Sequence, residues 1–434
     1  MEKSFKRQLH IAMLSLHSCP CGKLGSRYTG GMNIYIRNMA AELIRQGHIV
    51  DIFTCSHDDD ADCGLQLPGG YVNLIHIQAD DFAAISESNL DRHVSDLVKS
   101  IIDHSLTHGL RYDIIHSHYW LSGMVGELLK NVWGIPHVTM FHTLGKIKNE
   151  TGLGKVEPPY RIEKEHSIIS SSDLIIASTG REKIALVKKY DAVPGKISII
   201  PCGVNPSQFR PINKDLARRI CNVRAEKAML FVGRADPVKG LDNLLQAVSL
   251  LKDRDDFQLI VIGGDNTSMQ GVKQTISASG KYAISDRIHL VGPVPHDQMY
   301  LYYNAADFCV IPSYYESFSL VALEAIACST PILATDVGEV RDISHRCPLC
   351  HIIESNEPCL LADNIDRLFN LADGCTKACP DNLPIQYTWE HITGRIVEFH
   401  FTLIDDAVPF KQDTLQCRPV RSRKATELCP IITM

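Results

Sequence analysis

Two glutamates, Glu316 and Glu324, stand eight positions apart in a stretch that reads PSYYESFSLVALEAIACSTPILATDVG from residue 312. The apolar run Ala306–Ile311 predicts a strand that leads into it. Residues 317–328 predict a helix that is apolar on most faces and therefore buried. Glu324 would lie inside that helix, where a buried carboxylate needs a hydrogen-bond donor. Glu316 would lie just ahead of it, where unpaired N–H groups and the helix dipole can bind an anion.

The spacing of the two glutamates indicates their chemistry. Eight helical steps rise about 12 Å, which is more than the separation of most hydrolytic carboxylate pairs. We therefore interpret the pair as contacts to the two ends of one long ligand. A nucleotide-sugar has that shape, since it carries hydroxyls at both ends and a diphosphate between them. A buried helix with one tolerated glutamate is the alternative that the spacing leaves open.

Basic and glycine-rich stretches follow predicted strands. Gly233-Arg234 and then Lys239 come after the predicted strand Met229–Val232, where a guanidinium and an ammonium can neutralise a leaving diphosphate. Gly264 follows the next strand, and Gly31 precedes a predicted helix, where glycine lets backbone approach a phosphate closely. For the basic pair the alternative is a solvated turn, and for each glycine a plain turn.

Histidines end two strands of the first part of the chain. His116-Ser117-His118-Tyr119-Trp120 has no evident third ligand, so we predict a polar pocket wall and no metal site. His142-Thr143 ends the next strand, and His142 can bond a sugar hydroxyl, with a satisfied core histidine as the alternative. Arg161 alone is typical of a charge on a helix face.

For these residues to act together, the ends of their strands must lie close to one another. The order of the predicted elements indicates such an arrangement. Strands and helices alternate twice, which is typical of two doubly wound parallel sheets in an α/β protein, with ligands at the carboxyl ends of the strands. We predict domains at residues 1–205 and 206–385, a linker near 201–211, a closing helix within 386–404 and an irregular tail at 405–434. In the first domain the predicted strands are Leu9–Leu16, His48–Thr54, Tyr71–Ile77, Asp113–His118, His137–Phe141, Leu174–Ala177 and Ile197–Ile200.

Composition excludes several classes of function. The 434 residues are 45% hydrophobic and 22% charged with a net charge of −6, which gives no general attraction to nucleic acid or anionic membranes. No apolar run reaches about 18 residues, and the N-terminus resembles a strand more than a signal peptide, so we expect a cytoplasmic protein without a transmembrane segment. The sequence has no dinucleotide-binding or P-loop glycine motif.

The 15 cysteines predict thiols more than disulfides in such a compartment. Cys347-Pro-Leu-Cys350-His351 matches a haem c attachment pattern, but that chemistry requires export, so we interpret it as a chance match. Cys347, Cys350, Cys375 and Cys379 could form a four-thiolate zinc site, but a predicted helix, Leu360–Leu371, separates the two pairs.

Together the stretches resemble retaining family 4 (group 1) glycosyltransferases with the GT-B fold, two Rossmann-like domains facing each other across a cleft. Residues 316–324 are similar to the family's E-x7-E motif, and residues 233–240 to its G-R-x-x-x-x-K-G motif. GGMNIYI, HSHYWLSG, FHTLGKIKN and RIEKEHSII resemble sucrose-phosphate synthases and the mycothiol-pathway transferase that places N-acetylglucosamine on inositol phosphate. The resemblance runs in order to about residue 403.

The resemblance implies a role for each matching position. A nucleoside-diphosphate sugar, UDP-linked in our expectation, would bind Gly31, Gly233, Arg234, Lys239, Gly264, Phe318, Ser319, Leu320, Val321 and Glu324. Catalysis would use His142, Arg234, Lys239 and Glu316. A sugar or sugar-phosphate acceptor would meet Asn33, Tyr119, Thr143 and Arg161. No cofactor would be required, although Mg²⁺ could accompany the diphosphate, and a homodimer is a candidate assembly.

Three departures from the family are informative. Ser319 and Ser329 stand where relatives usually have glycine, and Ser319 could crowd the donor. Residues 84–88, Ala-Ile-Ser-Glu-Ser, lack the lysine that contacts acceptor phosphate in the inositol-phosphate enzymes, which predicts poor use of inositol phosphate. Ser319 keeps open a catalytically impaired sugar-nucleotide sensor. A nucleotide-sugar epimerase or phosphorylase on this fold is the other alternative, for which we find no motif.

Overall fold

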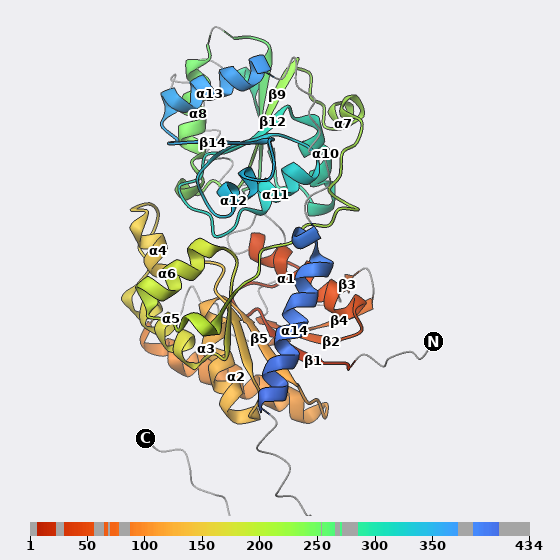
Figure 1. Cartoon of the computed structure of the whole chain (residues 1–434), viewed down its shortest axis with the longest axis vertical. Helices are drawn as coiled ribbons and strands as arrows, with labels where there is room; N and C mark the ends of the chain where they lie inside the picture. The colour runs from red at the N-terminus through yellow and green to blue at the C-terminus, as the bar shows by residue number, and fades with distance from the viewer. Residues whose placement is uncertain are drawn as a thin grey trace, which may run out of the picture.

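The computed structural model describes residues 7–22, 30–55, 65–67, 70–77, 87–252, 254–264, 270, 285–371 and 385–407. They form two lobes, each built on its own sheet with helices on both faces (Figure 1). The α/β fold with two doubly wound sheets, as predicted, is therefore confirmed.

The first lobe contains an eight-stranded sheet in the order β3-β4-β2-β1-β5-β6-β7-β8. All neighbours are parallel except β3 and β4, which form an antiparallel pair. The strands are β1 His10–Leu14, β2 Ile49–Cys55, β3 Leu65–Leu67, β4 Gly70–Ile77, β5 Ile114–His118, β6 His137–Met140, β7 Leu174–Ala177 and β8 Ile197–Ile199. The helices are α1 Gly31–Arg45, α2 Glu87–Thr107, α3 Tyr119–Trp133, α4 Gly145–Glu150, α5 Pro159–Ser171 and α6 Gly180–Tyr190.

The second lobe contains a six-stranded parallel sheet in the order β11-β10-β9-β12-β13-β14. Its strands are β9 Lys227–Val232, β10 Phe257–Ile262, β11 Ile288–Gly292, β12 Phe308–Ile311, β13 Ile332–Thr335 and β14 Cys350–Ile353. Its helices are α7 Lys214–Ile220, α8 Leu241–Leu250, α10 Met299–Ala305, α11 Leu320–Ala327, α12 Val340–Ser344 and α13 Pro358–Leu371.

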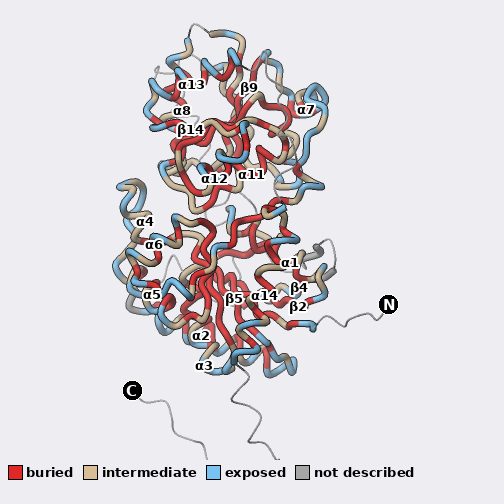
Figure 2. Tube along the Cα trace, in the orientation of Figure 1, coloured by how far each residue is buried: buried red, intermediate tan, exposed pale blue. Residues whose placement is uncertain are grey.

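Alternating side chains of the central strands explain the two-faced packing. In β1, Ile11 and Met13 join the apolar core on one face, and Ala12 and Leu14 join the core on the other. Because both faces of each sheet are covered, the strands are nearly continuous runs of apolar residues. Figure 2 shows the strands as buried and the outer turns of the helices as exposed.

The last described helix, α14 Trp389–Ala407, crosses back onto the first lobe (Figure 1). Arg395 donates to the carbonyl of Ile199, and the ring of Phe401 lies 6.2 Å from that of His48. The chain passes between the lobes twice at one place, since Val204 and Thr388 form a parallel bridge. Rotation of one lobe against the other would therefore be concentrated at these two crossings.

Several predicted element boundaries were wrong. The helix predicted from residue 317 begins at Leu320, because Ser319 has a left-handed φ of 84°, which a helix cannot include. The closing helix continues to Ala407, into the predicted tail. Strands β3 and β14 and helices α4, α7 and α12 were not predicted. The predicted helix at 272–279 lies outside the described residues.

Within the described residues, no helix is long and apolar enough to span a membrane, and no group of three acidic, histidine or cysteine side chains is arranged to hold a metal ion. No disulfide joins any of the described cysteines, which include Cys347 and Cys350. Cys375 and Cys379 lie outside the described residues, so the four-thiolate arrangement is untested.

Candidate active site

The carboxyl ends of both sheets point to the space between the lobes, and two helix N-termini meet there. A Cβ on Gly31, at the start of α1, would lie 3.5 Å from Cδ1 of Leu320, at the start of α11. Nearby, the hydroxyl of Ser178 in the first lobe donates to the carbonyl of Ser317 in the second at 3.0 Å. Because the first turn of a helix exposes N–H groups and a positive dipole end, two such ends form a site for a polyanion.

Lys239 and Glu316 form an ion pair on the second lobe's side of this space. The ammonium of Lys239 lies 2.7 Å from both carboxylate oxygens of Glu316, and the hydroxyl of Ser313 donates to the same carboxylate at 2.8 Å. Gly240, with a φ of 70°, permits this approach, since a Cβ there would lie 2.1 Å from the carbonyl oxygen of Pro312. A sugar hydroxyl or a phosphate entering the site would compete for this pair.

The other predicted phosphate residues lie on neighbouring strand ends. Arg234 follows β9, is 44% exposed at its side chain, and lies 3.6 Å from Asp236. Gly233 donates to the carbonyl of Ile262 at 2.9 Å. Gly263, with a φ of 114°, must be glycine because a Cβ would lie 2.4 Å from the carbonyl oxygen of Gly233. Gly264 follows with a φ of 72°. At these three glycines the ends of β9 and β10 therefore present backbone without side chains.

Glu324 is buried, at 6% exposure, and has the partners that its burial requires. Nε2 of His296 lies 2.6 Å from one carboxylate oxygen, and the hydroxyl of Tyr303 donates to the other at 2.8 Å. Both partners are far from Glu324 in sequence, so the sequence indicated the need for them but not their identity. A ribose at Glu324 would have to share these oxygens with Tyr303 and His296.

The helix start between the glutamates is strained. Ser319 caps α11 in the left-handed region, and no described group bonds its buried hydroxyl. A Cβ on Gly338 would lie 2.2 Å from the carbonyl oxygen of Phe318, so the loop after β13 presses directly on this turn. Ser329, at the other end of α11, also has a positive φ of 58°. These two serines occupy conformations that favour glycine, as the resemblance implied.

His142 belongs to a row of histidines that runs into the first lobe. Its Nε2 lies 3.0 Å from Nδ1 of His118, whose ring stacks on that of His116 at 4.8 Å. His116 in turn meets His400 of α14 at 5.4 Å. Loss of hydration lowers the pKa of each, to about 3 for His142 and His400. His142 is therefore neutral near pH 7, suited to hydrogen bonding rather than to proton transfer.

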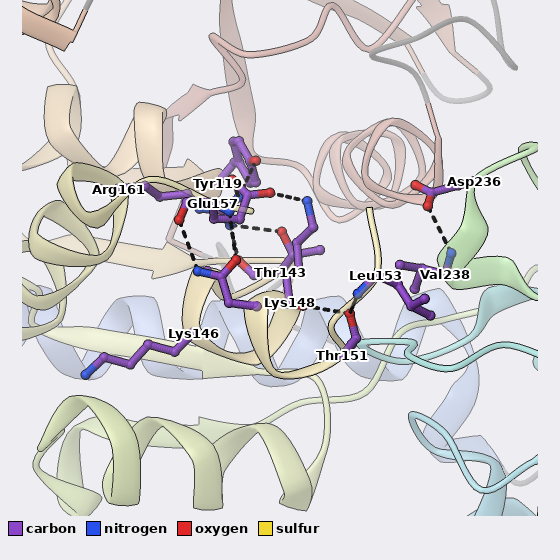
Figure 3. A network of polar contacts seen from close by, with 12 residues as sticks. Tyr119, Thr143, Lys146, Lys148, Thr151, Leu153, Glu157, Arg161, Asp236 and Val238 are labelled. Atoms are coloured by element: carbon purple, nitrogen blue, oxygen red, sulfur yellow. Dashed lines mark hydrogen bonds and ion pairs between the residues drawn. The ribbon is translucent and has the colours of Figure 1, made fainter. Parts of the chain in front are cut away.

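Arg161 lies at the centre of a buried network, shown in Figure 3. At 1% exposure, it donates to the hydroxyl of Tyr119 at 2.9 Å and to the carbonyl and hydroxyl of Thr143 at 2.9 and 3.1 Å. Glu165 and Glu157 balance its charge at 2.8 and 2.9 Å. Arg161 is therefore not a helix-face charge. Neither glutamate was predicted as a partner of Arg161, although their spacing of four residues from it on either side was a usable signal.

The predicted acceptor residues therefore divide into two places. Tyr119, Thr143 and Arg161 are held together, whereas Asn33 lies at the start of α1. Its amide donates to the hydroxyl of Ser18 and the carbonyl of Cys19, both at 2.7 Å, and its carbonyl oxygen accepts from Gly30 at 3.0 Å. Asn33 is fully buried and its bonds in this structure are internal. Residues 84–86 and the side chains of 87 and 88 lie outside the described part.

A cavity of about 860 Å³, a size typical of small-molecule sites, lies along α1. One face of α1, the crossing segment Val204–Gln208, the loop Pro293–Asp297 and the start of α14 line it, and it reaches Cys21. His296 belongs both to this lining and to the partners of Glu324. The cavity is therefore continuous with the surroundings of the second glutamate.

Comparisons with known proteins agree with this geometry. The model of Glycosyltransferase Family 4 matches residues 29–208, and that of Glycosyl transferases group 1 matches residues 215–377. A D-inositol 3-phosphate glycosyltransferase of Thermobispora bispora is 32% identical over 91% of this chain and 95% of the relative. One of Corynebacterium diphtheriae is 33% identical over 83% and 87%.

Solved structures match along most of the chain. Sucrose-phosphate synthase from Thermosynechococcus elongatus has a TM-score of 0.82 at 28% identity, covering 92% of this chain and all of that one. The Anabaena protein HepE, solved in complex with UDP and glucose, has a TM-score of 0.71 at 16% identity, covering 91% of this chain and all of that one. The second likeness shows the fold alone.

Proposed function

The chain belongs to the group 1 glycosyltransferases of the GT-B fold, and from this we propose that it is a retaining enzyme that transfers a hexosyl group from a UDP-linked sugar. The observation that carries the proposal is the meeting of two helix N-termini, at Gly31 and Leu320, between two separately held carboxylates. The diphosphate would lie at the helix ends, the ribose toward Glu324 and the sugar toward Glu316. The bound UDP and glucose of HepE support this choice of donor.

The proposed reaction uses no protein nucleophile. The bond from the anomeric carbon to the diphosphate breaks while the acceptor oxygen bonds to the same face, and the acceptor proton passes to the leaving diphosphate. Arg234, Lys239 and the start of α11 would stabilise the charge that develops on the diphosphate, because preorganised donors in a closed cleft act strongly on a transition state. His142, neutral and backed by His118, would bond a hydroxyl of the sugar.

The proposed acceptor is a sugar, a sugar phosphate or a cyclitol. The relatives' names support a phosphorylated cyclitol, and the Arg161 network would hold Tyr119 and Thr143 in place beside it. Because residues 84–88 lack a lysine, we propose that inositol phosphate is a poor substrate. A mass-spectrometric screen of nucleotide-sugars against sugar and cyclitol phosphates tests the whole assignment, and transfer from no UDP-sugar would overturn it.

The acceptor proposal predicts a gain from one substitution. Glu87→Lys restores a positive charge near the acceptor phosphate and should improve the apparent affinity for inositol phosphate by roughly 1 kcal/mol if the site is partly exposed. The measurement is kcat/KM with inositol phosphate at two salt concentrations. Efficient use of inositol phosphate by the unmodified protein would contradict the proposal, and an unchanged variant would mean that this loop does not contact the acceptor.

The two glutamates should separate nucleotide binding from turnover. Glu324→Gln removes the charge assigned to the ribose and should weaken binding of free UDP by about 1.5–3 kcal/mol, while keeping a side chain that His296 and Tyr303 can bond. Glu316→Gln should spare UDP binding and lower turnover. Titration calorimetry with UDP decides, with thermal unfolding of the free proteins as the control. Equal weakening in both variants is incompatible with the assignment.

A catalytically impaired sugar-nucleotide sensor is the second candidate, and the strained Ser319 is the observation that favours it. A sensor would bind UDP-sugar without hydrolysing it or transferring its sugar, whereas an enzyme should slowly hydrolyse the donor even without acceptor. We further propose that the protein acts in the cytoplasm, that it requires no resident metal, that Mg²⁺ accompanies the diphosphate as its counter-ion, and that two copies associate.

A further inference from the structure

A thiol–imidazole group lies in the loop after β1, apart from the residues assigned to the donor. Sγ of Cys19 is 3.5 Å from Nε2 of His76 on β4. Gly22 donates to the carbonyl of Cys19 at 2.9 Å, which closes a tight turn with Pro20 and Cys21 at its centre. Cys19 is 2% exposed, and Cys21 is half-buried and lines the cavity of about 860 Å³. A small solute in the cavity could therefore reach the turn.

The turn stabilises a negative charge on the sulfur of Cys19. Hydrogen bonding from the side chain of Cys21, with further bonds from the Cys21 backbone and His76, lowers the pKa of Cys19 from 9.0 to about 5, although burial opposes this. The pKa of other buried cysteines shifts the opposite way. Burial alone raises the pKa of Cys55 to about 12 and that of Cys221 to about 11. Cys19 is thus a thiolate near pH 7, the form that attacks electrophiles.

We propose that Cys19 and Cys21 form a peroxide-reactive thiol pair, with Cys19 as the attacking sulfur, His76 as its imidazole partner and Cys21 as the resolving thiol. The Cys19 thiolate attacks one oxygen of hydrogen peroxide, the O–O bond breaks, and the departing hydroxide takes up a proton to give water and a sulfenic acid. The Cys21 thiol then attacks that sulfur, a disulfide forms, and a second water leaves. Two thiols are oxidised and one peroxide is reduced.

The turn is bonded through the acceptor-side residue Asn33 to the start of α1, where the diphosphate is proposed to lie. The carbonyl of Cys19 accepts from the amide of Asn33, and Asn33 accepts from the backbone of Gly30, one residue before α1 begins. A disulfide demands its own Cβ and Cα separations, so closing one across Pro20 must change the turn. Oxidation should therefore shift the N-terminus of α1 and weaken UDP binding, a consequence that rests on the proposed function.

Peptide mass spectrometry tests the chemistry without reference to activity. Trypsin releases residues 8–23, which contain Cys19 and Cys21 and no other cysteine. Brief peroxide treatment of the reduced protein should remove two hydrogens from this peptide, reversibly with dithiothreitol. Cys21→Ser should stop at a sulfenic acid that dimedone traps, and Cys19→Ser should not react. The exposed Cys359 is the internal control. Modification of residues 8–23 no faster than Cys359 would overturn the proposal.

Two further measurements test the role of His76 and the effect of oxidation on UDP binding separately. The rate of Cys19 alkylation by iodoacetamide should rise at a higher pH in His76→Phe than in the unmodified protein, and coincident profiles would exclude the imidazole. Peroxide should lower UDP affinity several-fold in the unmodified protein and leave the Cys19→Ser, Cys21→Ser double variant unchanged. Unaltered UDP affinity in the disulfide form would overturn the link to the site. Failure of the reduced protein to bind UDP would instead contradict the proposed function.

Discussion

Lowering the pH from 7.5 to 5.5 should reduce the free energy of unfolding by several kcal/mol, because four fully buried histidines resist protonation. His116, His118, His137 and His400 are all 0% exposed, and burial lowers the pKa of each, to about 3 for His137 and His400. In the unfolded chain histidine titrates near 6.5, so below that pH the unfolded state binds more protons. The stabilisation is complete above pH 6.5 and is lost as the pH falls toward 3, at about 1.4 kcal/mol for each histidine at pH 5.5.

Two carboxyl groups act in the opposite direction. Burial raises the pKa of Glu339 to about 7 and also raises that of Glu182, so the folded state gains protons there as the pH falls and is favoured. These groups offset part of the effect of the four histidines. Asp51 is a paired carboxylate whose pKa is lowered from 3.8. The stability that such carboxylates contribute is lost only at more acidic pH, outside this window.

Urea unfolding at the two pH values measures this effect. His400→Leu should be less sensitive to pH than the unmodified protein by about 1 kcal/mol, because one buried titrating ring is gone. His391→Leu on the same helix is the matched control, since His391 is exposed and hydrated in both states. Equal stability at pH 7.5 and 5.5, or a His400→Leu variant as sensitive as the unmodified protein, would contradict the explanation.

Replacing Lys239 by alanine should lower kcat/KM by about 2 kcal/mol or more, a loss of at least 30-fold, because one preorganised charge is removed from the leaving diphosphate. Arg234→Ala should have a similar effect. Since Lys239 bonds both oxygens of Glu316, its loss also leaves that carboxylate without its cation. The double variant with Glu316→Gln should therefore lose less than the sum of the single losses.

Steady-state kinetics with a saturating acceptor gives these values. Lys214→Ala is a suitable control, because Lys214 is also a lysine of the second lobe that pairs with an acidic residue, Asp307. Asp307 directly precedes β12, so this pair lies at the amino end of a strand and not at the carboxyl end, where the proposed site is. It should leave kcat/KM near that of the unmodified protein. Near-normal turnover of Arg234→Ala or Lys239→Ala would exclude these side chains from the leaving group.

The sequence predicted the fold and the strand ends well because both depend on local patterns. Apolar runs and turn residues determine where β6, β9 and β12 stop, and parallel winding then places His142, Arg234 and Glu316 just after the carboxyl ends of these strands. Arg161 was misjudged because its partners Thr143 and Tyr119 are 18 and 42 residues away. His76, 57 residues from Cys19, could not be found from sequence for the same reason.

Backbone conformation was the other feature that the sequence did not predict. Tyr119, His142 and Ser319 all have positive φ, at 75°, 59° and 84°, and only at Ser319 did comparison with a glycine position give a hint. Side-chain patterns report burial and periodicity, whereas a left-handed residue is imposed by tertiary contacts such as that of Gly338 with Phe318. The start of α11 was placed three residues early for this reason.

The return of α14 to the first lobe has a consequence for synthesis. The surface of α1 that α14 covers, and the ring of His116 that meets His400, are made early, while α14 is made last. At about 5–20 residues per second, the ribosome needs roughly 10–40 s to pass from β8 to α14. During that time the first lobe presents an uncovered apolar face. The nascent chain must therefore be protected from aggregation until its final helix emerges, and the first lobe expressed alone should be insoluble unless α14 is supplied.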